Sequence, residues 1–74
     1  MRPVVGAFFT HKTIKANPQD KHSPGAQMVV TGVKMHWVHF RYANPTSKQA
    51  GRPGFGLDYA EFVRNYPEAC EEES

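Results

Sequence analysis

Hydrophobic positions in this chain fall into short segments separated by polar residues, prolines and glycines. The first segment, residues 4–14, is rich in β-branched and aromatic residues, which favours a strand. Gly6 lies inside it, where a glycine typically marks a bend or a bulge. Residues 17–26 carry two prolines and a polar stretch with no large apolar side chain to bury. The pattern therefore predicts a strand bent near its start, followed by a long loop.

The next two segments predict an antiparallel hairpin. Residues 27–31 and 35–42 are both of β type, and a short link that begins with Gly32 joins them. Because side chains alternate between the faces of a strand, one face should line the core through His36, Val38, Phe40 and Tyr42. The opposite face then carries Met35, Trp37, His39 and Arg41.

A second loop, residues 43–54, precedes the last structured part of the chain. Residues 55–57 are enough for one short strand, and a helix should follow. Asp58 is a favourable N-cap with Glu61 three residues later, the capping-box spacing. One apolar stripe with helical spacing comes next, formed by Tyr59, Phe62, Val63 and Tyr66. Pro67 should end the helix, because proline cannot continue it.

The length of the chain limits the architecture to one small domain. A chain of 74 residues buries only about 60% of its unfolded surface, so its core must be tight. Short strands, long polar loops and one late helix are typical of mainly β proteins. Curling the strands encloses a core with few residues and shortens the exposed edges. We therefore expect a small antiparallel β-barrel with one short C-terminal helix.

The charge of the chain is divided unevenly. Residues 1–67 carry all nine basic residues and three of the seven acidic ones, a formal charge of +6. Residues 68–74 carry four glutamates and no basic residue. We expect one domain over 1–67 and an acidic, flexible tail over 68–74 that can be removed without loss of the fold. The tail either competes with a polyanion bound by the body or only aids solubility.

Four stretches of the sequence together resemble a known group of proteins: Gly6-Ala7-Phe8-Phe9, Met28-Val29-Val30, Trp37-Val38-His39-Phe40 and the helix from Asp58 to Tyr66. Over residues 4–67 the chain is similar to small SH3-like β-barrel proteins of unknown function that phages and other mobile elements encode. The resemblance implies an SH3-like barrel and a binding role toward nucleic acid or protein. The loops 17–26 and 43–54 depart from the usual pattern, so the resemblance says nothing about them.

Candidate metal and catalytic residues do not form a convincing set. His36 and His39 should point to opposite faces of one strand, and the chain has no Cys-x-x-Cys or His-Glu-x-x-His spacing. Capping accounts for Asp58 and Glu61, and Cys70 lies among glutamates that disfavour its thiolate. We expect no metal, no cofactor and no enzymatic activity. The glycine-rich residues 51–56 favour a turn over a phosphate-binding loop.

The outward stripe of the hairpin is the best candidate site, with Lys34 at the turn and Arg52 in a loop able to reach it. The candidate binding residues are therefore Lys34, Trp37, His39, Arg41 and Arg52. Aromatic rings interleaved with basic groups suit unpaired bases and phosphates, and they equally suit a protein interface. In a third interpretation Trp37 only closes the core beneath a loop.

We therefore expect a small binding module whose partner is nucleic acid, with a host or phage protein as the alternative. The protein alternative includes an inhibitor. No apolar run approaches the roughly 18 residues of a membrane span, and the N-terminus lacks a signal-peptide core. We expect a cytoplasmic protein without membrane contact, and the pattern leaves a homo-oligomer open.

Overall fold

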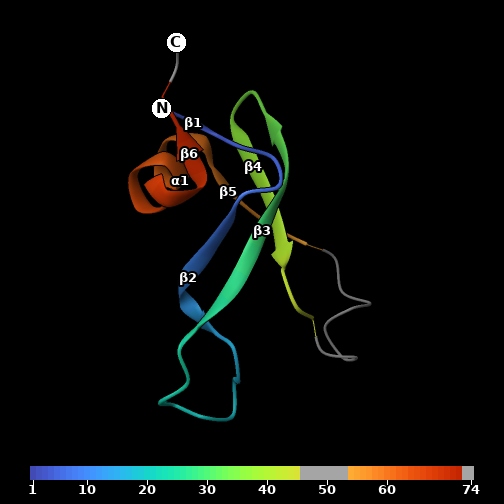
Figure 1. Cartoon of the computed structure of the whole chain (residues 1–74), viewed down its shortest axis with the longest axis vertical. Coiled ribbons are helices and arrows are strands. Elements are labelled where there is room, and N and C mark those ends of the chain that lie inside the picture. The colour runs from blue at the N-terminus through green and yellow to red at the C-terminus, as the bar shows by residue number, and fades with distance from the viewer. Residues whose placement is uncertain (46–53, 73–74) are drawn as a thin grey trace.

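The computed structural model describes residues 1–45 and 54–72 and is mainly β (Figure 1). A four-stranded antiparallel sheet has the order β2-β3-β4-β5, and a two-stranded ribbon pairs β1 with β6. The strands are β1 (Arg2–Pro3), β2 (Phe8–Lys15), β3 (Gly25–Lys34), β4 (Trp37–Tyr42), β5 (Phe55–Asp58) and β6 (Cys70–Glu71). Helix α1 (Tyr59–Asn65) and the 3-10 helix η1 (Pro67–Ala69) lie between β5 and β6.

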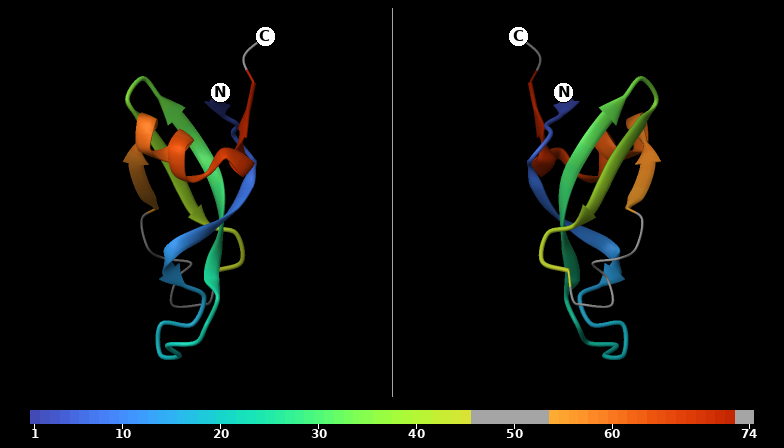
Figure 2. Two further views of the ribbon diagram at one scale, coloured as in Figure 1. Left: turned by 90° about the vertical axis from the view of Figure 1, so that its left-hand side faces the viewer. Right: turned by 90° about the vertical axis from the view of Figure 1, so that its right-hand side faces the viewer.

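The large sheet is curled into a half-barrel, and its concave face is covered from one side. Helix α1 lies against this face, together with the β1–β6 ribbon at one end (Figures 1 and 2). Among the described residues, no helix or strand packs on the opposite, convex face of β3 and β4 (Figure 2, right). The prediction of a small, curled antiparallel β fold with one short C-terminal helix is thereby confirmed.

Alternation along the strands builds the core as the sequence predicted. Val38 and Phe40 on β4 face inward and are almost fully buried, as are Met28 and Val30 on β3. Phe9 of β2 is the centre of an aromatic cluster, with ring centroids 5.1 Å from Phe40, 5.1 Å from Phe62 and 4.6 Å from Tyr66. Truncating a buried phenylalanine to alanine typically costs about 3–5 kcal/mol, so these rings contribute much of the stability of so small a domain.

Helix α1 begins and ends where the sequence predicted. The carboxylate of Asp58 accepts hydrogen bonds from the backbone N–H groups of Ala60 (3.0 Å) and Glu61 (3.4 Å), which have no partner within the helix. Phe62 and Tyr66 of the apolar stripe are buried, and Pro67 follows the last turn. The helix is short and gains its stability from packing against the sheet.

The hairpin turn lies three residues later than the sequence analysis placed it. Strand β3 continues through Gly32 to Lys34, and the chain reverses at Met35 and His36. The longer ladder adds the pairs Gly32–His39, Val33–Val38 and Lys34–Trp37. A register shift between Val30 and Gly32 keeps Val30 opposite Phe40, with both side chains in the core. His36, expected on the core face, is therefore exposed in the turn.

The expectation of a flexible tail from residue 68 is wrong for the residues up to Glu71. Ala69 is 1% exposed, and its carbonyl accepts a hydrogen bond from Val4 N–H (2.9 Å). Strand β6 then pairs with β1, and Glu71 forms a salt bridge with Arg2 (2.9 Å). The charge of the segment misled the sequence analysis, because one buried alanine and backbone hydrogen bonds are sufficient to dock it. The domain boundary at residue 67 is corrected accordingly.

The first loop, predicted over 17–26, occupies a shorter part of the chain because β3 begins at Gly25. Two side chains organise it: Asn17 accepts from the N–H of Gln19 (3.2 Å) and Asp20 accepts from the N–H of His22 (2.9 Å). Such Asx turns substitute for backbone hydrogen bonds. The second predicted loop, 43–54, lies mostly outside the described residues.

Candidate functional site

The convex face of the sheet carries most of the predicted binding residues. On β4, Trp37, His39 and Arg41 point away from the core, because Val38 and Phe40 between them are buried. Trp37 is 44% exposed, Arg41 is exposed and His39 is half-buried. The third interpretation, in which Trp37 closes the core, does not fit this position. We call the convex side of β2, β3, β4 and β5 the outer face.

Strand register brings further residues onto the outer face beside this stripe. Lys34, expected in the turn, is instead the last residue of β3 and lies directly opposite Trp37. His39 lies between two glycines, Gly32 on β3 and Gly56 on β5. Arg41 lies opposite Val29. The structure therefore brings together four of the five predicted residues, whereas Arg52 lies outside the residues that the structure describes.

Trp37 is held in place by a glycine that the sequence analysis did not connect with it. A Cβ atom built on Gly56 would overlap the Nε1, Cε2 and Cδ1 atoms of the indole. The ring of Trp37 therefore lies across the bare backbone of β5, which needs a residue without a side chain at this position. The remainder of the indole stays open to solvent. Trp37 is thus a fixed aromatic surface, which lowers the entropy lost when a ligand stacks on it.

Phe8 is a second exposed aromatic residue on this side of the sheet, and sequence reasoning did not assign it to the site. It lies opposite Val29, which in turn lies opposite Arg41, so the three residues form one row across the strands. The side chain of Phe8 is 56% exposed, whereas that of Phe9 is 3% exposed. Alternation gives two adjacent phenylalanines opposite directions, but only the register shows which one faces the core.

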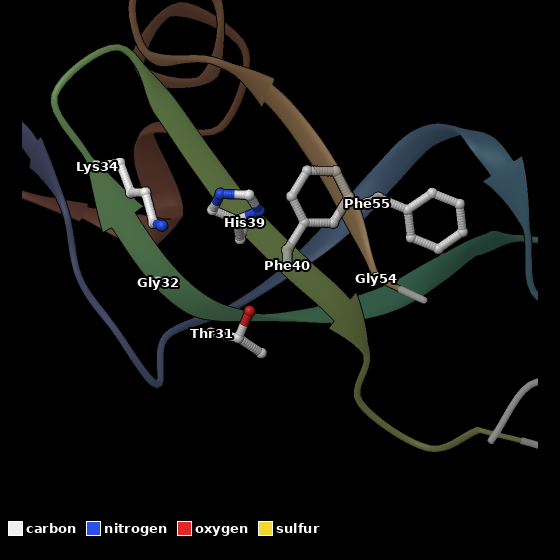
Figure 3. Close-up of a pocket in the computed structure, with 7 residues that line it drawn as sticks. All are labelled: Thr31, Gly32, Lys34, His39, Phe40, Gly54 and Phe55. Carbon is white, nitrogen blue, oxygen red and sulfur yellow. The ribbon is translucent and has the colours of Figure 1, made fainter. Parts of the chain in front are cut away.

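An open hollow lies between the strands in the middle of the outer face (Figure 3). Its volume is about 530 Å³. Lys34 and His39 stand over it from neighbouring strands, and Thr31 lies at its border on β3 (Figure 3). The residues that line it are Thr31, Gly32, Lys34, His39, Phe40, Gly54 and Phe55. Sequence reasoning missed it because it depends on which glycine lies opposite His39.

The charge on the outer face is positive. The guanidinium of Arg41 donates to the carbonyl of Tyr42 (3.1 Å), and its other N–H groups have no hydrogen-bond partner among residues 1–45 and 54–72. Asp58 lies in the same row as Lys34 and Trp37, but its carboxylate is engaged in capping α1. Of the C-terminal glutamates, Glu71 is paired with Arg2 on the β1–β6 ribbon.

The histidines and the cysteine lie apart from one another. Among residues 1–45 and 54–72, no group of three or more His, Cys, Asp or Glu side chains could hold a metal ion. Cys70 is half-buried, and its thiol donates to the carbonyl of Tyr66 (3.5 Å). Burial raises the pKa of the Cys70 thiol, which lowers its thiolate fraction and so its reactivity.

Comparisons with known proteins found no match: no protein-family model, no curated protein and no solved structure is similar to this chain. The SH3-like assignment and the resemblance to mobile-element proteins therefore stay predictions. Within the described parts of the chain, the one α-helix is far too short to cross a lipid bilayer.

Proposed function

We propose that this protein is a small, non-enzymatic binding module whose outer face binds single-stranded nucleic acid. The observation that carries the proposal is the combination of the exposed Trp37 ring with Lys34 and Arg41 on one open sheet face. Aromatic rings stack on unpaired bases whatever their sequence, and basic side chains neutralise the phosphates between them. A flat sheet face with exposed aromatic residues is a common platform for this kind of binding.

Three further features support the proposal. Phe8 supplies a second ring beyond Arg41, so a strand that crosses the sheet can contact one aromatic residue on each side of the basic groups. Trp37 is fixed against Gly56 and does not need to be ordered on binding. The formal charge of +6 over residues 1–67 attracts a polyanion.

The proposal is tested by titrating a labelled oligonucleotide of about 10 nucleotides and following its fluorescence anisotropy. We expect binding at about 50 mM salt and a linear fall of log affinity with log salt concentration. Arg41→Ala should weaken binding to all sequences alike and reduce the salt slope by about one unit. Trp37→Phe should keep most of the affinity, because a ring remains for stacking.

Arg64→Ala is the matched control for Arg41→Ala. It removes the same charge from the last turn of α1, which covers the other face of the sheet. Its affinity and salt slope should stay close to those of the unmodified protein. Equal losses for the two variants would show that only net charge matters and would contradict a site on the outer face.

The alternative is a protein-interaction module that uses the same face, for which the exposed apolar side chains of Phe8 and Trp37, with the half-buried Val29, are the supporting observation. An apolar protein interface depends little on salt, whereas phosphate contacts depend on it steeply. Absence of oligonucleotide binding at about 50 mM salt would overturn the nucleic-acid proposal, and the protein partner would become the leading candidate. The proposal also includes an origin of this protein in a phage or another mobile element, which rests on the sequence resemblance alone.

A further inference from the structure

We propose that the hollow beside His39 is a nucleobase pocket, in which one unpaired base of a bound single strand lies over Gly32 of β3, beside the His39 ring of β4. The inference rests on the proposed function and adds to it a defined place for a base. It predicts that part of the preference for a strand with bases over a bare sugar–phosphate chain depends on the hollow, in addition to the part that stacking on Trp37 and Phe8 supplies.

The hollow exists because the residues directly opposite His39 on both neighbouring strands are glycines, which have no side chain. Its partners across the sheet are Gly32 and Gly56, and the space over Gly56 is filled by the Trp37 ring. A Cβ atom built on Gly32 meets nothing within 4 Å, so the position over Gly32 is open. The result is an open recess over Gly32, which is part of the hollow of about 530 Å³ that also reaches Gly54 and Phe55.

The groups around the recess suit a base better than a simple anion. The half-buried imidazole of His39 offers a ring surface and two nitrogen atoms, and the hydroxyl of Thr31 can donate or accept a hydrogen bond. Phe55 is half-buried at its border, and Phe40, whose ring lies in the core, lines it from beneath. One ammonium group, from Lys34, stands at the border (Figure 3). A planar, partly apolar ring with polar edges fits these surroundings, and such edges are the groups that proteins contact on an unpaired base.

Basic side chains flank the recess on both sides along the strands. Same-face neighbours in a strand are about 7 Å apart and adjacent strands about 5 Å apart. Arg41 is the next outer-face residue after His39 on β4, and Lys34 lies diagonally on the opposite side. A nucleotide with its base in the recess would therefore have its neighbouring phosphates within reach of one cation on each side. Duplex DNA cannot insert a base in this way without unstacking it.

Gly32→Val is the variant that tests the pocket. Gly32 lies in a strand and does not need a positive φ, so a β-branched residue fits its backbone and fills the recess without a change of charge. The probes are two labelled oligonucleotides of equal length, one of thymidines and one of abasic sites. We expect the unmodified protein to bind the thymidine strand about tenfold or more tightly than the abasic strand, in line with the stacking energy of a base.

In Gly32→Val, the affinity for the thymidine strand should fall about fivefold or more, whereas the affinity for the abasic strand should not change. The preference for bases that remains comes from stacking on Trp37 and Phe8. Gln27→Val is the matched control, since it places the same side chain on the outer face of β3 outside the recess. It should keep the preference for bases. If Gly32→Val fails to fold, Gly32→Ala should give a partial loss of the same preference.

A second measurement needs no variant. The ring-proton resonances of His39 should shift when the thymidine strand is added and stay unchanged with the abasic strand. An undiminished preference for bases in the folded Gly32→Val or Gly32→Ala protein would overturn the pocket while leaving the proposed function intact. Equal affinity of the unmodified protein for the two strands would exclude base stacking, and with it both the pocket and the proposed function. Binding of neither strand would remove the proposed function, and the pocket with it.

Discussion

A single histidine side chain organises the irregular part of strand β2. The Nδ1 atom of His11 accepts hydrogen bonds from the backbone N–H groups of Thr13 (3.1 Å) and Ile14 (3.0 Å). These donors lie where the register between β2 and β3 shifts, so they lack regular strand partners. The imidazole packs near the rings of Phe40 (5.8 Å) and Tyr66 (5.7 Å). His11 therefore has to keep Nδ1 unprotonated, and its burial lowers its pKa.

This arrangement predicts a loss of stability in mild acid. Because the pKa of His11 is lower in the folded state than the ordinary value of 6.5, its contribution is complete above about pH 6.5. The contribution should be lost as the pH falls through the folded pKa, since protonation removes the acceptor. His11→Asn keeps a side-chain acceptor for the turn but does not titrate in this range. Thermal melts between about pH 7.5 and pH 5 should show a larger drop for the unmodified protein.

The other histidines provide the internal control for this prediction. His22, His36 and His39 are present in both proteins, so whatever they contribute cancels in the comparison. Identical pH dependence of the melting temperature in the two proteins would contradict a neutral, hydrogen-bonded His11. A melting temperature of His11→Asn close to that of the unmodified protein at about pH 7.5 would also show that the acceptor, rather than the ring, supports the register shift.

Single residues also show where sequence reasoning reaches its limit. The alternation of Trp37, Val38, His39 and Phe40 was predictable, because it follows from the period of a strand. The places of Phe8 and Gly56 were not, because both depend on pairing with strands far away in the sequence. The support of Trp37 by Gly56 and the open recess over Gly32 are therefore properties of the register.

At the level of elements, the C-terminal segment should be part of the stable fold. Truncation after Pro67 removes the buried Ala69, its hydrogen bond with Val4 and the pairing of β6 with β1. Each lost hydrogen bond contributes roughly 1 kcal/mol, and each kcal/mol lowers the melting temperature of a domain of this size by about 4–8 °C. We expect the truncated protein to melt at least about 5 °C lower in thermal denaturation.

Glu71→Gln separates docking of the segment from its charge. The salt bridge between Arg2 and Glu71 is exposed on both sides, and such pairs contribute at most about 1 kcal/mol. The variant keeps the strand pairing, so its melting temperature should stay near that of the unmodified protein. If the truncated protein were as stable as the full chain, residues 68–74 would be a dispensable tail.

The elements that sequence predicted best are those with local signals. Asp58, the helical stripe and Pro67 specify α1 within one short stretch, and the structure follows them. The hairpin turn was misplaced because Gly32 looked like a turn residue, whereas the turn at Met35 and His36 allows three more pairs between β3 and β4. The docking of β6 had no local signal, since its partner lies at the other end of the chain.

At the scale of the whole molecule, the size of the chain explains why the outer face is open. One short helix and one two-stranded ribbon cover the concave side of the sheet, and no further element remains among the described residues for the convex side. A sheet face that is exposed to water needs polar side chains, and Lys34, Arg41 and the threonines supply them. The aromatic residues Phe8 and Trp37 on it need another explanation, which binding supplies.

The last prediction concerns the division of charge across the molecule. Glu68 and Glu72 are exposed, and neither belongs to β6. Replacing both with glutamine raises the formal net charge from +2 to +4 without a change of size. Charges outside the binding face act on the ligand through the long-range electrostatic field. Replacing these two glutamates should therefore change the association rate more than the dissociation rate.

We expect the double variant to bind an oligonucleotide faster, by on the order of twofold, at about 50 mM salt. The gain should shrink at about 200 mM salt, because screening shortens the range of the field to less than about 10 Å. Stopped-flow association at the two salt concentrations measures it, and an unchanged melting temperature checks the fold. A gain that does not depend on salt would contradict a long-range electrostatic effect of the two glutamates.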